Sequence, residues 1–145
     1  MRAVVQRVAW AKVEVDGEII GEIEKGLLVY LGVGKGDGDT ASNYILGKVL
    51  GLRIFEDDQG KMNHGVVDVG GKLLVVSQFT LYGDSRKGRR PSWTAAAPGP
   101  VAAPLVAGVV DALRARGLEV ATGTFGADMA VSMVNDGPVT LIIDA

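Results

Sequence analysis

Four residues at the end of an apolar run, Ser77-Gln78-Phe79-Thr80, carry groups that could take part in a reaction. Serine and threonine hydroxyls can attack a carbonyl carbon or form hydrogen bonds, and a glutamine amide can orient a substrate. A hydroxyl nucleophile normally needs a neighbouring base, yet the chain has no cysteine and a single histidine, His64. His64 stands in a turn-like segment, so we interpret it as a solvated loop residue without a role. With no second histidine and no cysteine, we expect no metal site.

Two further groups could contribute to binding. The cations Arg86, Lys87, Arg89 and Arg90 fall within one short segment, and Gly137-Pro138 follows two residues typical of turns. Each group alone also has an ordinary structural interpretation: a polar strand end, a solvated basic loop and a turn proline. Residue types and spacing leave both interpretations open.

Length and composition limit the classes of protein to consider. The 145 residues, 48% hydrophobic and 22% charged, predict one domain over residues 1–145 with a sizeable core. The lack of cysteine is compatible with a reducing compartment, and no apolar run approaches the roughly 18 to 20 residues that span a bilayer. We therefore expect a cytoplasmic protein without a membrane partner. Because the net charge is −2, any nucleic-acid binding would depend on a local basic patch.

Hydrophobic periodicity predicts the elements that must position these residues. We expect strands over residues 3–15, 18–23, 27–33, 53–55, 73–79, 129–134 and 139–144, and helices over 40–50 and 100–116. Asp39 or Thr40 is the expected cap of the first helix, and residues 135–138 are the expected turn between the last two strands. The pattern indicates an α+β domain dominated by strands, with two helices against a sheet or open barrel.

Several segments form a set that extends along the whole chain. They are MRAVVQRV at 1–8, LRIFED at 52–57, GKMN at 60–63, SQFTL at 77–81, KGRRPS at 87–92, FGADM at 125–129 and VNDGPVT at 134–140. In this set the sequence closely resembles the D-aminoacyl-tRNA deacylase (D-tyrosyl-tRNA deacylase) family, to which Ser-Gln-Phe-Thr and Asn-X-Gly-Pro-X-Thr together are specific. Trp10-Ala11-Lys12 and His64 depart from the family pattern, but both lie outside these two motifs.

The resemblance implies a homodimer of β-barrel-like subunits that hydrolyses the ester between a D-amino acid and the terminal adenosine of tRNA. Ser77, Gln78, Phe79 and Thr80 are the implied catalytic residues, with backbone N–H groups near Phe79 and Thr80 holding the carbonyl oxygen. An aminoacyl ester is already activated, so positioning and oxyanion stabilisation can suffice, and we expect no cofactor. Either the Thr80 hydroxyl is the nucleophile, or a water attacks with help from the ribose 2′-hydroxyl. We favour the second, because the sequence supplies no base for Thr80.

Selection between D- and L-amino acids is implied to lie in Gly137-Pro138. In the family picture this dipeptide is joined by a cis peptide bond and enters the partner subunit's pocket, where it excludes L side chains. Arg7 would fix its orientation and Met129 would pack nearby. Glycine, which has no side chain, would not be excluded.

The resemblance also gives the basic segment a partner, since Arg86, Lys87, Arg89 and Arg90 would meet phosphates at the acceptor end of aminoacyl-tRNA. No DNA partner is expected. Two alternatives remain: a non-catalytic RNA-binding domain, and an L-amino-acid editing domain related to that of threonyl-tRNA synthetase. The free-standing length and the Gly137-Pro138 motif argue against both.

Overall fold

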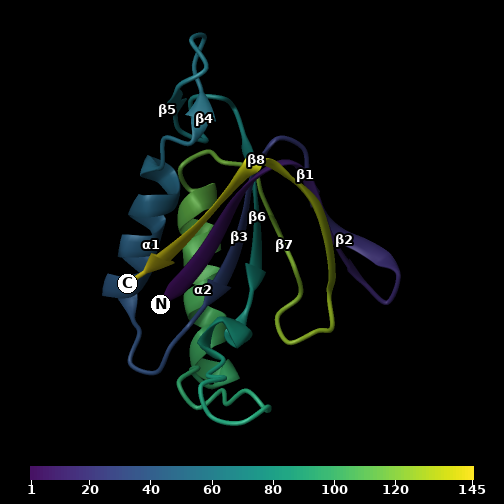
Figure 1. Cartoon of the computed structure of the whole chain (residues 1–145), viewed down its shortest axis with the longest axis vertical. Helices are drawn as coiled ribbons and strands as arrows, with labels where there is room; N and C mark the ends of the chain where they lie inside the picture. The colour runs from purple at the N-terminus through teal and green to yellow at the C-terminus, as the bar shows by residue number, and fades with distance from the viewer.

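A computed structural model describes all 145 residues and shows a twisted, barrel-like sheet with both helices on one side (Figure 1). The elements in chain order are β1 (Arg2–Val15), β2 (Glu18–Ile23), β3 (Gly26–Gly32), α1 (Asp39–Gly51), β4 (Phe55–Glu56), β5 (Met62–His64), β6 (Lys72–Ser77), the 3₁₀ helix η1 (Phe79–Tyr82), α2 (Gly99–Arg114), β7 (Val120–Thr122) and β8 (Ala130–Asp144). The main sheet runs β2-β1-β3-β6-β7, with β8 also paired to β1, and β4-β5 form a separate pair. The expected class, strand-dominated α+β with two helices, is confirmed.

The strand pairings explain why the helices share a face. β3 pairs with β6 in parallel, and β6 pairs with β7 in parallel. Parallel neighbours require a long crossover connection. The first connection contains α1 and the second contains α2, and both pack on the same side of the sheet (Figure 1).

The core has two parts, one on each face of the central strands. A cluster of 22 buried residues joins the helices to the sheet, and a second cluster of 7 lies on the other face. Leu27 belongs to the first cluster and Leu28 to the second, so β3 is buried on both faces. This explains why its sequence is a continuous apolar run instead of an alternating one.

Two differences from the predicted elements bear directly on the functional residues. The strand expected over residues 73–79 ends at Ser77, and Phe79–Tyr82 turn into a 3₁₀ helix. The two strands expected at the carboxyl end are one continuous strand, β8, that pairs with β1 on both sides of an irregularity. Residues 135–138 are therefore a bulge within a strand and not a hairpin turn, because β1 continues past them as the pairing partner.

Smaller differences lie elsewhere. The residue that caps α1 is Gly38, without a side-chain cap, in place of Asp39 or Thr40. His64 lies in the short strand β5, paired with Phe55, and not in a loop. The strand expected over 53–55 overlaps β4 (Phe55–Glu56) only at Phe55, and β5 and β7, each three residues long, were not predicted. Elements this short carry too few residues to show a period.

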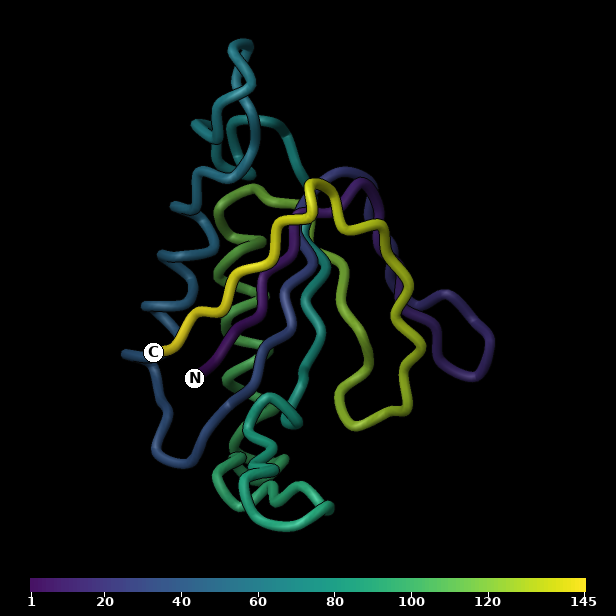
Figure 2. The backbone as a smooth tube through the Cα atoms, viewed as in Figure 1, coloured from purple at the N-terminus to yellow at the C-terminus, as the bar shows by residue number.

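The two ends of the chain lie side by side (Figure 2). The backbone N–H of Ala145 donates to the carbonyl of Met1 over 2.8 Å. No helix of the chain combines the length and the apolar character needed to cross a membrane.

Candidate functional site

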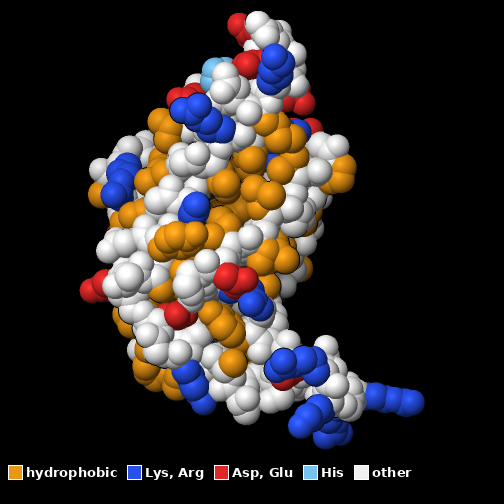
Figure 3. Space-filling view, turned by 60° about the vertical axis from the view of Figure 1, so that its left-hand side comes forward, with side chains coloured by type: hydrophobic (Ala, Val, Ile, Leu, Met, Phe, Trp, Pro, Cys, Tyr) orange, Lys and Arg blue, Asp and Glu red, His pale blue; other side chains and the backbone are white.

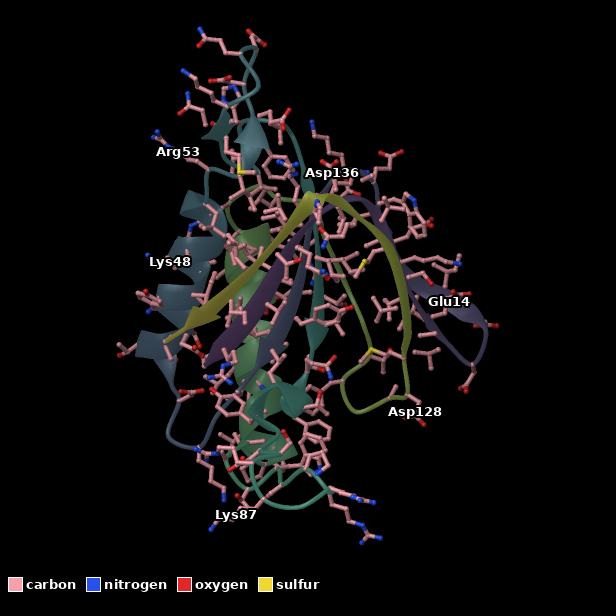
Figure 4. The ribbon with its side chains drawn as sticks, viewed as in Figure 1. Glu14, Lys48, Arg53, Lys87, Asp128 and Asp136 are labelled. Atoms are coloured by element: carbon pink, nitrogen blue, oxygen red, sulfur yellow. The ribbon has the colours of Figure 1, made fainter.

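A cavity opens where β6 ends. It has a volume of about 570 Å³ and lies between the strand end, η1, the start of α2 and the loop before β8. Its lining includes Ser77, Gln78, Phe79, Trp93, Phe125 and Met129. Figure 4 shows this region at the lower end of the sheet, with Asp128 in the loop that leads into β8. Three of the four predicted catalytic residues therefore line one cavity, and Thr80 follows them directly in η1.

The backbone turns sharply between Ser77 and Thr80. The N–H of Gln78 still continues the sheet by donating to the carbonyl of Leu31 over 2.9 Å. The next two N–H groups, of Phe79 and Thr80, take part in no turn, cap or side-chain hydrogen bond. The first N–H groups of a helix lack partners within it, and these two are left free for a ligand oxygen.

The Thr80 hydroxyl has one hydrogen-bond partner. It accepts a hydrogen bond from the side-chain amide of Gln78. An amide N–H donates and cannot take up a proton, so this contact orients the hydroxyl without activating it as a nucleophile. The sole histidine lies on β5, at the opposite end of the sheet (Figure 1).

No group of three or more His, Asp or Glu side chains gathers closely enough to hold a metal ion. The site instead presents hydroxyl, amide and backbone N–H groups beside apolar walls. Such groups can position a substrate and stabilise negative charge on an oxygen.

Phe79 and Trp93 form the aromatic rim of the cavity. Their ring centroids are 5.5 Å apart at an interplanar angle of 75°, an edge-to-face contact. Both rings stay partly exposed, Phe79 at 57% and Trp93 at 40%, so they offer apolar surface to a ligand. Sequence reasoning missed Trp93 and Phe125. Phe125 begins the segment FGADM and Trp93 directly follows KGRRPS, so an aromatic residue in or next to a segment of the family resemblance was the only signal available.

The basic segment forms an exposed loop next to η1, at the lower end of the molecule (Figures 3 and 4). Asp84 and Ser92 close its base through two backbone hydrogen bonds of 2.8 and 2.9 Å. The Arg86 guanidinium binds both carboxylate oxygens of Asp84, over 2.9 and 2.7 Å, and lowers the pKa of Asp84 to about 2. Arg86 is thus already paired, whereas no ion pair engages Lys87, Arg89 or Arg90.

Gly137 and Pro138 lie in the bulge of β8, opposite Arg7 of β1. The peptide bond between them is cis, and both residues are exposed. Gly137 has φ +118°, and a Cβ placed there would lie 2.8 Å from Cγ2 of Val139 and 2.9 Å from Nη2 of Arg7. Only glycine fits this conformation and this space.

Arg7 holds the bulge from beneath. It is the only buried charged residue, 5% exposed, and its Nη1 donates to the carbonyl of Ile54 over 2.6 Å. Its Nε lies 3.0 Å from Oδ2 of Asp136, an ionic contact without the geometry of a hydrogen bond. Asn135 also stabilises the bulge, since its side-chain oxygen accepts a hydrogen bond from the N–H of Val139 and its side-chain amide donates one to the Thr140 hydroxyl.

The structure does not bring the two groups of residues together within one chain. Asp136, beside Gly137, is at the upper end of the sheet, whereas Lys87 and η1 are at the lower end (Figure 4). Met129 lies with Phe79 in the cavity wall and not beside Gly137 of the same chain.

Comparison with known proteins identifies the family. Residues 4–144 match the family described as D-Tyr-tRNA(Tyr) deacylase. The chain belongs to this family.

Relatives named D-aminoacyl-tRNA deacylase agree with that assignment. The relatives from Desulfitobacterium hafniense and Thermosipho africanus are each 57% identical over 145 residues, 100% of this chain and 97% of theirs. The relative from Heliobacterium modesticaldum is 58% identical over 144 residues, 99% of this chain and 96% of its own.

Two solved structures share the fold. One, titled c-Myc DNA Unwinding Element Binding Protein, has a TM-score of 0.93 at 39% identity and covers 100% of this chain and 99% of its own. The other, a probable eukaryotic D-amino acid tRNA deacylase, has a TM-score of 0.84 at 19% identity and covers 99% of this chain and 98% of its own. The chain is a hydrolase that acts on D-aminoacyl-tRNA, as the sequence resemblance predicted.

Proposed function

We propose that the ester of D-aminoacyl-tRNA is hydrolysed at the cavity beside Ser77–Thr80, with water as the nucleophile. The observation that carries this proposal is the pair of backbone N–H groups at Phe79 and Thr80 without a turn, cap or side-chain hydrogen bond, next to a cavity in which no side-chain base is hydrogen-bonded to the Thr80 hydroxyl. Water adds to the ester carbonyl carbon, and the N–H groups stabilise the resulting oxyanion. The intermediate then collapses with loss of the ribose oxygen, which takes up a proton and leaves free D-amino acid and tRNA.

The ribose 2′-hydroxyl next to the ester assists the attacking water in this proposal. Thr80 serves as a positioning group, since its hydroxyl is bound by the Gln78 amide, which cannot accept a proton. Ser77 and Gln78 orient the substrate. The test compares Thr80→Ala with a substrate that ends in 2′-deoxyadenosine, under single-turnover conditions.

Thr80→Ala should keep deacylation within about tenfold of the parent, and the 2′-deoxy substrate should lose about a hundredfold or more, the range that general acid–base assistance supplies. Complete loss of activity in a folded Thr80→Ala protein that still binds tRNA would return the nucleophile role to Thr80.

Gly137-Pro138 provides the chiral selection across a homodimer interface in our proposal. Its exposed position, held by Arg7, leaves the dipeptide available to a second copy, and its place at the other end of the sheet from η1 supports selection between subunits. Steric exclusion needs no side-chain pocket, so many D-amino acids and glycine are accepted. A thousandfold preference for D over L corresponds to about 4 kcal/mol.

Exposed apolar residues on the β1-β8 ribbon support a second copy. Trp10 is 41% exposed and pairs with Val134, which is 45% exposed, and Ile142 is 70% exposed. Sedimentation should give a dimer at micromolar concentration. A monomer that retains full D-over-L selectivity would contradict selection across the interface.

The basic loop binds acceptor-end phosphates in the same proposal. The cations without an ion pair, Lys87, Arg89 and Arg90, carry most of this binding, and Arg86 less, because Asp84 already holds it. Changing Arg89 and Arg90 to Ala should weaken binding of different tRNAs to a similar extent. It should also lower the slope of log affinity against log salt by about 2. Arg53→Ala, an exposed arginine at the far end of the molecule, is the matched control.

The name of one structural neighbour, a DNA unwinding element binding protein, raises DNA binding as a second candidate, since the same cations could bind DNA phosphates. Competition between tRNA and duplex DNA for the protein tests it. Deacylation of D-aminoacyl-tRNA and not of its L counterpart would separate the proposed function from a purely RNA-binding role and from an L-amino-acid editing role.

A further inference from the structure

The 3₁₀ helix η1, which follows the proposed catalytic residues Ser77 and Gln78 and contains Phe79 and Thr80, packs against the end of β3 through the ring of Tyr82, its last residue. The ring packs directly on the backbone at Gly34, where an added Cβ would lie 2.8 Å from its Cζ and Oη atoms. At Gly32 an added Cβ would lie 3.3 Å from the ring and 2.9 Å from the carbonyl oxygen of Gln78. The absence of side chains at these two positions allows η1 to sit against the end of the strand.

Arg2 clamps the same turn from the other side. Its Nη1 donates to the carbonyl of Leu81 over 3.1 Å, and its guanidinium carbon lies 5.6 Å from the centroid of the Tyr82 ring. Its Nε donates to Oδ1 of Asp144 at 2.5 Å, which holds the guanidinium in place. A planar guanidinium can serve two acceptors and a ring face together, and a lysine ammonium cannot reproduce this arrangement.

Asp37 completes the support from the loop after β3. One carboxylate oxygen accepts from the N–H of Gly34 over 2.6 Å, pairs with the Met1 ammonium over 2.6 Å and lies 3.4 Å from the Tyr82 hydroxyl. Burial and the nearby charge of Asp37 raise the pKa of Tyr82, so its hydroxyl stays a neutral donor.

We propose that Arg2 and Tyr82 are positioning residues for the deacylation reaction. They set the backbone of η1 so that the Phe79 and Thr80 N–H groups face the ester. In this proposal neither Arg2 nor Tyr82 touches the reacting atoms. The clamp acts at the carbonyl of Leu81, one residue beyond Thr80, and the ring acts at the end of the same turn. This inference rests on the proposed function in one respect, that the ester is held at this turn.

The test measures single-turnover deacylation of D-aminoacyl-tRNA by Arg2→Ala, Arg2→Lys and Tyr82→Ala at a temperature where each protein is folded. Arg116→Ala is the matched control, because its guanidinium also donates to a carbonyl, that of Ala112, but on α2. We expect Arg2→Ala and Tyr82→Ala to lower the maximal rate about tenfold with little change in the substrate concentration at half-maximal rate. A displacement of the site by 1 Å can lower the rate roughly a hundredfold, so the tenfold loss expected here corresponds to a smaller shift of the η1 backbone. The maximal rate of Arg2→Lys should lie between those of Arg2→Ala and the parent, and the maximal rate of Arg116→Ala should equal that of the parent.

Amide hydrogen exchange supplies a second measurement. The N–H of Leu81 donates to Gln78 and that of Gly83 to Thr80, so both should exchange faster in Arg2→Ala while amides of β1 and β3 keep their protection. The positioning role would be overturned if Arg2→Ala kept a maximal rate within twofold of the parent. Unchanged amide exchange at Leu81 and Gly83 in Arg2→Ala would overturn it as well.

A change of Phe79 to Pro separates this inference from the function on which it rests, because proline has no backbone N–H and is tolerated at the first position of a helix. If a folded Phe79→Pro protein leaves deacylation unchanged, the site itself is misplaced and the proposed function fails. If Phe79→Pro is impaired and Arg2→Ala is not, only the positioning role fails.

Discussion

Removal of the Arg7 side chain tests whether this buried cation holds the Gly137-Pro138 bulge. The hydrogen bond from Arg7 to the buried carbonyl of Ile54 is charge-assisted and should contribute about 1.5–3 kcal/mol. The ionic contact with Asp136 adds at most about 1 kcal/mol, because the Asp136 side chain is 53% exposed. Arg7→Ala should therefore lower the free energy of unfolding by about 3 kcal/mol.

The assay is thermal unfolding at one fixed protein concentration, because association of subunits would make Tm depend on concentration. For a domain of this size, each kcal/mol shifts Tm by about 2–4 °C, so the expected decrease is about 6–12 °C. Asp136→Asn, which removes only the ionic contact, is the control and should cost less than about 1 kcal/mol. The same proteins are then assayed for the ratio of D- to L-aminoacyl-tRNA hydrolysis, which should fall in Arg7→Ala.

A Tm for Arg7→Ala within 2 °C of the parent would refute the stability argument. A folded Arg7→Ala protein with an unchanged D-to-L ratio would refute the role of Arg7 in orienting the bulge, and Arg7 would then be a structural residue only.

The remaining predictions concern two glycines and one carboxylate. Gly26→Ala should lower the free energy of unfolding by at least about 3 kcal/mol, since the new Cβ would lie 1.9 Å from the carbonyl oxygen of Lys72. Gly47→Ala, in open space on α1, should raise the free energy of unfolding by about 0.5–1 kcal/mol. Denaturant unfolding measures both changes. The Asp84 carboxyl should titrate near pH 2 by carbon NMR, and Arg86→Ala should return the midpoint toward 3.8. Because the pKa of Asp84 is depressed in the folded protein, its contribution to loop stability is present above about pH 4 and is lost as pH falls through 2; a midpoint near 3.8 in the parent would contradict the pairing.

Much of the fold could be predicted from hydrophobic periodicity. The long strand β1 and both helices extend over enough residues for a period to be visible. The short strands β5 and β7 could not be predicted, because three residues show no period and owe their conformation to a neighbouring strand. The bulge at Gly137 was predicted as a hairpin turn for a related reason. A bulge and a turn use the same residue types, and only the continued pairing of β8 with β1 shows that this segment is a bulge.

The sequence by itself determined the family, the Ser-Gln-Phe-Thr and Gly-Pro motifs and the absence of cysteine and of a second histidine, since these depend on residue types and their order. Tertiary structure alone decided that Trp93 and Phe125 line the cavity with Phe79, because these residues come from segments far apart in the chain. It also decided that Arg7 lies beneath Gly137, across 130 residues of sequence, because β1 and β8 pair from opposite ends of the chain. Contacts of this kind are set by which strands become neighbours, and that choice depends on burial of the whole core, which no local pattern records.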